Sequence, residues 1–411
     1  NAWPVRIEAE PANSDEASQS SDLKISQGAT DWGGPAPRGQ DFPSAGNFSR
    51  EPAKIFDEMR ADPLLAGRQV VVQINHVDSF FGAGGLEIDS GFVGKDPQSN
   101  VTPASKRLNP ALTNLFDRDF DSLELWIGVD GREHQLEKFL GQNIGDWFNL
   151  LNRGLLRTLV ANSDTHDRRL TSLSTRNYIS APTVLSQGQP DPQKMRQAPH
   201  DIGDAIRNGY STGSNSLFMQ VKASNALTQG AGLEQSDAFG VKTKPLVALG
   251  GKVSLKVDIQ SPEWAEYDEI SVYINTPTTR HKDQFGQPSS PARYNICSPG
   301  HRLGLTDFSR ARVPVTTIDG TTYQRLESSA TIDLTLLKDS WVVVLARGND
   351  GVSKPLWPVV PNDFSDSGDG LGTRSSADTG TVAMAVSNPI YVDVDGNGWH
   401  APALNVVASC P

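Results

Sequence analysis

The chain has 411 residues, of which 37% are hydrophobic and 21% are charged, a balance typical of a globular protein long enough for two domains. Its formal net charge of −11 argues against a nucleic-acid partner, because there is no excess of basic side chains to neutralise phosphates. No apolar run reaches the roughly 18 residues of a transmembrane helix, which argues against a membrane span.

The first half of the chain alternates helix-like and strand-like segments. Apolar residues recur every three to four positions in the former and run continuously or alternate in the latter. In chain order we expect a helix over 51–60, a buried strand over 70–75, a strand over 123–127, a helix over 144–152, a strand over 155–160, a short strand over 177–179 and a helix over 201–208. This alternation is typical of a parallel α/β layer or barrel.

From about residue 215 the pattern changes to short segments with a period of two. Apolar and polar residues alternate over 252–259, 269–274 and 330–336, whereas 341–346 is a continuous apolar run. Period-two strands between turn-rich loops predict an antiparallel β-sandwich. The expected fold is therefore α/β plus all-β, with an α/β domain over 1–215, a connecting segment over 216–250 and a β-sandwich domain over 251–411.

Two histidines follow predicted buried strands. His76 comes directly after the strand over 70–75, and Asp164 and His166 come shortly after the strand over 155–160. In α/β barrels the C-terminal strand ends gather ligands, and carboxylate plus imidazole is a common donor set for Zn, Mn or Fe. Each motif alone is also compatible with an ordinary hydrogen-bonded histidine or a solvated turn. Two strand-end motifs in one chain favour one divalent metal site formed by His76, Asp164 and His166.

Three weaker signals accompany this site. Arg168 follows the metal pair and is a candidate catalytic residue that orients an anionic substrate, with a solvated loop as the alternative. Asp393, Asp395 and Asn397 alternate with glycines and resemble part of a calcium-binding loop, although Asp-Gly-Asn-Gly is also a good turn sequence. Glu124 lies inside a predicted strand, where it is either a partner of the metal ligands or a salt-bridged strand residue.

The two cysteines, Cys297 and Cys410, both lie in polar, turn-rich segments of the C-terminal part. They are compatible with one disulfide in an oxidising compartment, and two unrelated free thiols are the alternative. The first residues lack the charged and apolar regions of a signal peptide, so we expect a mature or processed chain. Low cysteine and methionine usage with an acidic balance favours an exported protein, extracellular or periplasmic.

Several longer motifs together carry a family resemblance. They are Ile74–His76, Asp121–Trp126, Asp146–Gly154, Asn162–His166, Ser174–Tyr178, Ala205–Gly213 and Ser387–Gly398. In order and spacing they resemble the carbaryl-hydrolase-like (CehA/McbA-type) branch of the PHP metallohydrolases, named for polymerase and histidinol phosphatase. The resemblance spans most of the chain and is most specific from Asp146 to His166.

The resemblance implies a fold, a metal centre and an activity. Residues 1–215 would be the C-terminal portion of a distorted (β/α)7 barrel, with two or three divalent metals (Mn, Zn or Fe) at its C-terminal strand ends. His76 matches the family's late strand-end histidine ligand, and Asp164 and His166 match its final Asp-x-His pair. The implied activity is metal-dependent hydrolysis of phosphate or carboxylic/carbamate esters.

The remaining ligands of the family include an early His-x-His motif, which this sequence lacks, and no histidine precedes His76. The resemblance therefore implies that an N-terminal fragment of the same precursor, or another subunit, completes the barrel and makes the site active. The alternative is a non-catalytic extracellular scaffold or binding protein built on a degenerate barrel. Stoichiometric transition metal in the native protein separates the two hypotheses.

Overall fold

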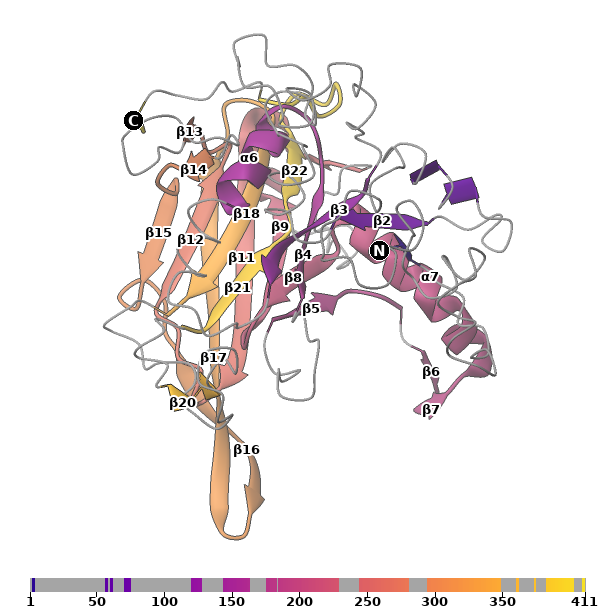
Figure 1. The fold of residues 1–411 in the computed structure, drawn as a ribbon. Coiled ribbons are helices and arrows are strands. Elements are labelled where there is room, and N and C mark those ends of the chain that lie inside the picture. Colours follow the sequence, from indigo (N-terminus) through magenta and orange to yellow (C-terminus); the bar gives the residue numbers. More distant parts are fainter. Residues whose placement is uncertain are drawn as a thin grey trace, which may run out of the picture. The chain divides into compact units, whose positions relative to one another are not determined.

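The computed structural model describes part of the chain. The described residues are 2–3, 56–57, 60–61, 70–74, 120–127, 143–162, 175–182, 184–228, 244–280, 294–348, 360–361, 373–374, 382–402 and 409–410. They are mostly β-sheet, as the ribbon in Figure 1 shows. They group into two compact units: unit 1 comprises Asn1–Leu123, Ser180–Arg207 and Ser290–Ala292, and unit 2 comprises Glu124–Ile179, Asn208–Ser289 and Arg293–Pro411.

Unit 1 contains a small group of strands and most of one helix. Its elements are β1 (Ala2–Trp3), β2 (Val71–Ile74), the start of β3 (Ser122–Ile127), the hairpin of β6 (Leu185–Ser186) and β7 (Gln189–Pro190), and helix α7 (Pro192–Asn208). β1 is antiparallel to β2, and β2 is parallel to β3. The expected strand before His76 is confirmed as β2, whose four residues are all buried.

Helix α7 begins nine residues before the expected helix over 201–208. The carboxylate of Asp191 accepts the backbone amides of Gln193 and Lys194, so it caps the N-terminus, and Pro192 suits the first helical position. Pro199 lies inside the helix and interrupts the sequence pattern there. The helix ends before Gly209, whose φ of 81° is a left-handed conformation that glycine adopts easily.

Helix α6 (Ile144–Asn152) in unit 2 matches the predicted bounds, but all nine of its residues are buried instead of one face. The ring of Phe148 lies 4.6 Å from that of Trp341, centroid to centroid. The polar side of the helix is also partnered, because Asn152 accepts the indole N–H of Trp341 and donates to the carbonyl of Thr276. Gly154, with φ of 80°, follows the C-cap residue.

The remaining strands belong to unit 2. They are β4 (Thr158–Asn162), β5 (Arg176–Ile179), β8 (Ser211–Ser214), β9 (Phe218–Asn225), β10 (Leu246–Val247), β11 (Lys252–Pro262), β12 (Glu269–Ile274), β13 (Thr278–Arg280), β14 (Tyr294–Ile296), β15 (His301–Gly304), β16 (Ala311–Ile318), β17 (Thr321–Thr335), β18 (Ser340–Arg347), β19 (Val360–Pro361), β20 (Thr373–Arg374), β21 (Met384–Ser387) and β22 (Ile390–Asp393). Two 3-10 turns, Ala226–Thr228 and Leu249–Gly251, join some of them.

These strands form open sheets. One sheet has the order β10-β22-β18-β21-β8-β5, with β12 pairing both β18 and β15, and a second has the order β16-β17-β11-β9. β4 lies beside β3 in a further sheet. The barrel expected for residues 1–215 is not shown by the described residues, whereas the open sheets of unit 2 are consistent with the expected sandwich.

The core of unit 2 lies between the first two sheets. Along β11, Val253, Leu255 and Val257 are fully buried while the alternate positions Lys252 and Lys256 are exposed, as the period-two pattern predicts. β18 is buried along almost its whole length, as expected of a continuous apolar run with neighbours on both sides. The inward residues of both sheets form one apolar cluster. Burial removes their side chains from water and so stabilises the folded state.

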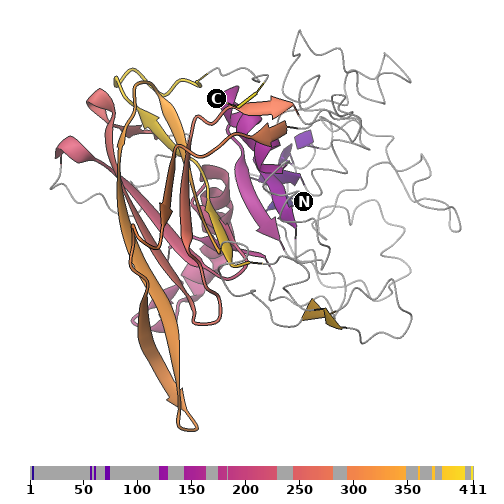
Figure 2. The ribbon, with the colours of Figure 1, turned by 90° about the vertical axis from the view of Figure 1, so that its left-hand side faces the viewer.

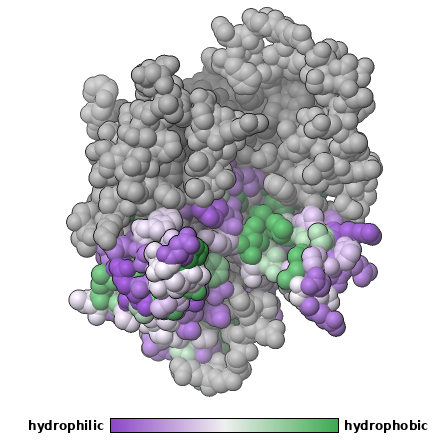
Figure 3. All heavy atoms as spheres, turned by 90° about the horizontal axis from the view of Figure 1, so that it is seen from below, coloured by the Kyte–Doolittle hydropathy of each residue, from purple (hydrophilic) through white to green (hydrophobic). Residues whose placement is uncertain are grey.

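The hairpin of β16 and β17 projects beyond the rest of the sandwich (Figures 1 and 2). Its two strands turn at Asp319 and Gly320, which both have positive φ, and Val315, Ile318 and Tyr323 are exposed along it. Seen from below, the coloured surface is largely hydrophilic with small hydrophobic patches (Figure 3).

Candidate functional site

The four residues predicted for the metal and substrate site, His76, Asp164, His166 and Arg168, lie outside the described residues. The structure describes the strands that lead to them. β2 ends at Ile74, two residues before His76, and β4 ends at Asn162, two residues before Asp164. The first four residues of β4 are buried.

Side-chain amides hold β4 in place by hydrogen bonding to its backbone N–H and carbonyl groups, as the backbone of a neighbouring strand would. The amide of Asn388 accepts the backbone N–H of Leu159 at 2.7 Å and donates to its carbonyl at 3.1 Å. Two residues further along, Asn177 does the same to Ala161, at 2.9 and 2.7 Å. Gly213 lies against this strand so closely that an added Cβ would come within 2.9 Å of Leu159 and Ala161 side chains. The position therefore requires glycine.

The last residue of β4, Asn162, makes hydrogen bonds with three other residues. Its Nδ2 donates to Oε1 of Glu124 at 2.7 Å, and its Oδ1 accepts a longer bond of 3.4 Å from Nδ2 of Asn177. Its backbone carbonyl accepts the hydroxyl of Thr175. We call Glu124, Asn162, Thr175 and Asn177 the β4 clamp. Because Asn162 precedes the segment 163–174 and Thr175 follows it, the clamp holds the two ends of that segment together.

Glu124, on β3, is only 2% exposed, although it is a carboxylate. A buried carboxylate is costly unless donors face it, and the amide of Asn162 is one such donor. From the sequence, Glu124 is either a partner of the metal ligands or a salt-bridged strand residue. In the structure it accepts a hydrogen bond from Asn162, which precedes Asp164 by two residues. Asn162, Thr175 and Asn177 lie inside two of the motifs that carry the resemblance, but no role was predicted for them, because side-chain amides and hydroxyls in strands leave no periodic signal.

A second cluster of oxygen ligands lies at one end of the sandwich. One carboxylate oxygen from each of Asp339, Asp393 and Asp395 lies within 4.8 Å of the others, and oxygen-rich sites of this kind suit Ca²⁺. Asp393 and Asp395 belong to the predicted calcium motif, whereas Asp339 comes from the turn before β18 and was not predicted. The third motif residue, Asn397, is exposed and donates its Nδ2 to Asp395.

The carboxylates of Asp393 and Asp339 also organise the segment 393–400, which we call the Asp393 loop. Asp393 accepts the backbone amides of Asp395, Gly396 and Gly398 at 3.2, 2.7 and 2.9 Å. Asp339 accepts the amides of Val394 and His400, at 3.0 and 2.7 Å. Burial alone would raise the pKa of Asp393, but these amides outweigh it and hold the pKa below its ordinary value. The loop is therefore closed by two carboxylates that accept its own backbone amides.

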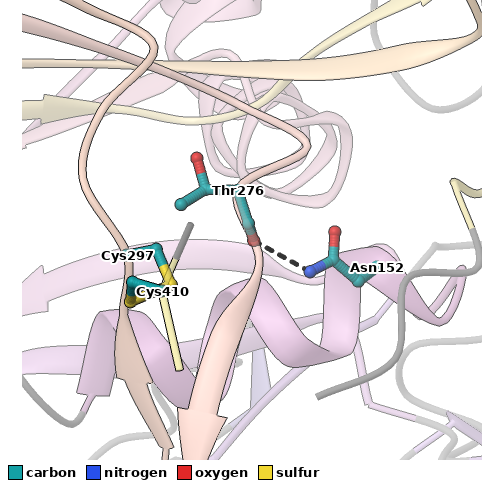
Figure 4. Close-up of a disulfide and its surroundings, with 4 residues drawn as sticks. All are labelled: Asn152, Thr276, Cys297 and Cys410. Atoms are coloured by element: carbon teal, nitrogen blue, oxygen red, sulfur yellow. Dashed lines mark hydrogen bonds between the residues drawn. A yellow bond between two sulfur atoms is a disulfide. The ribbon is translucent and has the colours of Figure 1, made fainter. Parts of the chain in front are cut away.

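A disulfide joins Cys297 to Cys410, with a Cα–Cα distance of 5.3 Å, so of the two alternatives that the sequence left open the structure shows the disulfide. Figure 4 shows it beside the hydrogen bond from Asn152 of α6 to the carbonyl of Thr276. Cys297 is buried and Cys410 is exposed. The bond thus ties the end of the chain to the sandwich.

No family model and no curated protein matches this chain. Among the described residues, no helix is both long and apolar enough to cross a membrane. The described features that bear on function are the strand ends, the β4 clamp, the carboxylate cluster and the disulfide.

Proposed function

We propose that this chain belongs to a metal-dependent hydrolase of phosphate or carboxylic/carbamate esters, with His76, Asp164 and His166 as ligands of divalent Mn, Zn or Fe. One observation carries the proposal. Both ligand motifs begin two residues beyond the ends of buried strands, β2 in unit 1 and β4 in unit 2. Ligands in α/β metalloenzymes gather at such strand ends, and the resemblance to PHP metallohydrolases assigns the same three residues.

The donor set fits this chemistry. The two imidazoles of His76 and His166 and the carboxylate of Asp164 suit Mn, Zn or Fe. A further carboxylate, that of Glu124, is buried at the end of β4. A bound divalent metal lowers the pKa of a coordinated water and polarises the ester oxygen. Arg168 would bind the anionic part of the substrate, since guanidinium pairs well with phosphate or carboxylate.

The site needs further ligands, because the sequence contains no His-x-His motif. We propose that they come from an N-terminal fragment of the same precursor or from another subunit that completes the barrel. The disulfide between Cys297 and Cys410 supports an exported protein, extracellular or periplasmic, because such bonds persist in oxidising compartments. Ca²⁺ at the Asp393 loop is a separate proposal, supported by the three clustered carboxylates.

The test is metal analysis and turnover of the protein purified with any polypeptide that accompanies it. We expect bound Mn, Zn or Fe in near-stoichiometric amount, and hydrolysis of p-nitrophenyl phosphate or p-nitrophenyl acetate. His166→Ala should lose both the metal and the turnover. His301→Ala, which changes an exposed histidine on β15, is the matched control and should lose neither. Unchanged metal content and rates in His166→Ala would remove the residue from the mechanism.

The alternative function is a non-catalytic extracellular scaffold or binding protein. Two features favour it: the sandwich and the acidic cluster of Asp339, Asp393 and Asp395. Neither feature requires a transition metal. A native preparation without Mn, Zn or Fe and without esterase or phosphatase turnover would support this alternative over the hydrolase.

A further inference from the structure

We propose that Arg302 and Arg347 form a binding site for a phosphoryl group, supplied by free phosphate or by a phosphate monoester. The two arginines lie on β15 and β18, the strands that pair with β12 on its two sides, and both face the buried carboxylate of Glu269 on β12. The inference goes beyond the proposed function and does not depend on it, because none of these residues is a proposed metal ligand.

The register of the strands places the charged residues on one face of the sheet. Arg347 is directly opposite Glu269, and Arg302 is opposite Ser271, two residues further along β12. Ile270, which lies between Glu269 and Ser271, belongs to the apolar core. Because side chains alternate between the two faces of a strand, the arginines, the carboxylate and the serine share the face away from that core.

Two positive charges meet one negative charge in this group. Nε of Arg302 lies 3.5 Å and Nε of Arg347 lies 3.4 Å from the same oxygen, Oε1 of Glu269. The glutamate is 7% exposed, and a buried carboxylate requires a counter-charge, which one arginine supplies. The second arginine leaves a positive charge unbalanced in a chain whose formal net charge is −11. The group therefore attracts an anion locally.

The hydrogen-bond donors of both guanidinium groups are available. Oε1 of Glu269 accepts the hydroxyl of Ser271 at 2.8 Å, whereas neither arginine side chain donates a hydrogen bond to an acceptor in the described part of the chain. Nε of Arg347 is buried without an acceptor. The side chains of Arg302 and Arg347 are 58% and 26% exposed, so a solute reaches their outer nitrogens. Each guanidinium offers N–H donors in a fixed planar fork.

Two adjacent guanidinium groups suit a phosphoryl group better than a carboxylate. One guanidinium fork matches the two oxygens of a carboxylate through two parallel N–H bonds. A phosphoryl group carries a further oxygen, so a second fork bonds to it at the same time. Glu269 holds both arginines at one point, which reduces the side-chain freedom that is lost when the anion binds.

Arg312 on β16 provides a matched control, because its balance of charges is reversed. Its guanidinium lies between two carboxylates, 3.6 Å from Glu263 and 3.6 Å from Glu266, and its side chain is 51% exposed. Replacing Arg312 by alanine changes the net charge of the protein as much as replacing Arg302, at a similar exposure. The variant therefore reports the general effect of net charge on anion binding.

The experiment is calorimetric titration of the purified protein with inorganic phosphate at constant ionic strength. We expect saturable binding to the wild type. Arg302→Ala and Arg347→Lys should each lower the affinity about tenfold or more, because each loses charge-assisted hydrogen bonds of one fork. Arg312→Ala should bind within about twofold of the wild type. Titration with glycerol phosphate tests the monoester, and acetate should bind about tenfold more weakly than phosphate.

Three outcomes overturn the inference. The first is a wild type without saturable phosphate binding, and the second is an equal loss of affinity in Arg302→Ala and Arg312→Ala, which would be an effect of net charge. The third is loss of phosphate binding in His166→Ala with Arg302→Ala unchanged, which would place the phosphate at the proposed metal centre. Acetate binding as tight as phosphate would overturn the phosphoryl assignment. The hydrolase proposal is judged by metal content and turnover, so it stands or fails separately from this site.

Discussion

Two loops of unit 2 are closed by polar side chains, and they are closed in opposite ways. In the Asp393 loop, the carboxylates of Asp393 and Asp339 accept five backbone amides of the loop itself. In the β4 clamp, side chains from β3, the end of β4 and residues 175–177 bond to one another and to backbone. The first arrangement holds a turn through its own amides, whereas the second joins three separate segments around the ends of one stretch of chain.

The two arrangements differ in how far their own hydrogen bonds account for the carboxylate that each contains. The carboxylate of Asp393 already has partners that account for its burial and ionisation, so the shape of its loop follows without an ion. The clamp places a buried carboxylate and two side-chain amides at the end of β4. These are more polar groups than the end of a strand requires. Variants of the disulfide and of the Asp393 loop measure how firmly the C-terminal segment is held and whether a cation stabilises it further.

The largest expected effect concerns the disulfide, which ties the C-terminal segment beyond the Asp393 loop to the sandwich. Its cysteines are 113 residues apart in sequence, so removing the bond frees a long loop in the unfolded chain. We expect the double variant Cys297→Ser, Cys410→Ser to lose about 4–5 kcal/mol of unfolding free energy. Urea unfolding of the variant against the wild type measures the loss.

The wild-type protein reduced under denaturing conditions and refolded in reductant is the control for the serine side chains. It should unfold at the same urea concentration as the double variant. A loss below about 1 kcal/mol in both samples would show that hydrogen bonding alone secures the C-terminal segment.

Asp393→Ala should have the next largest effect. The change leaves three backbone amides without their acceptor at a site where the side chain is 3% exposed. We expect a loss of about 3 kcal/mol, measured by urea unfolding at pH 7. Asp395→Ala is the matched control, because this carboxylate is exposed and should cost below about 1 kcal/mol. Equal losses in the two variants would contradict the role given to the buried amide bonds.

The same residue predicts a pH dependence. The folded-state pKa of Asp393 is lowered, so its stabilising contribution is fully present above the unfolded pKa of about 4. It is lost as the pH falls through the lower folded pKa. The wild type should therefore lose stability below about pH 4, and Asp393→Asn should show a flatter profile in that range. Parallel profiles for the two proteins would exclude Asp393 as the titrating group.

The smallest expected effect is stabilisation by Ca²⁺ at Asp339, Asp393 and Asp395. Extracellular calcium modules bind with dissociation constants near about 10⁻³ M, so about 10 mM Ca²⁺ should add about 1.4 kcal/mol. A rise in melting temperature with Ca²⁺, absent in Asp395→Ala, would support the site. Mg²⁺ at the same concentration is the control for ionic strength. No difference between Ca²⁺ and Mg²⁺ would leave the cluster as a purely structural turn.

Sequence patterns were most informative where structure is local. The strand before His76, helix α6 and the alternation along β11 follow from apolar spacing, because a side chain's face in a helix or strand depends only on its position in the period. The ligand motif around Asp164 stays a prediction. The start of α7 was missed because Pro199 breaks the helical pattern, while the cap at Asp191 lies well before it.

The sequence by itself determined the strand before His76, the alternating strands over 252–259, 269–274 and 330–336, helix α6, and which two cysteines were available to pair. Only the tertiary structure decided that β5 and β8 join the sheet of β18, that Asp339 approaches Asp393, and that Asn177 and Glu124 meet at the end of β4. The physical reason is that apolar periodicity depends only on the order of residues within one segment of the chain. Bonds between distant polar side chains, in contrast, depend on how the whole core packs, and single amides and carboxylates carry no repeat from which to predict their partners.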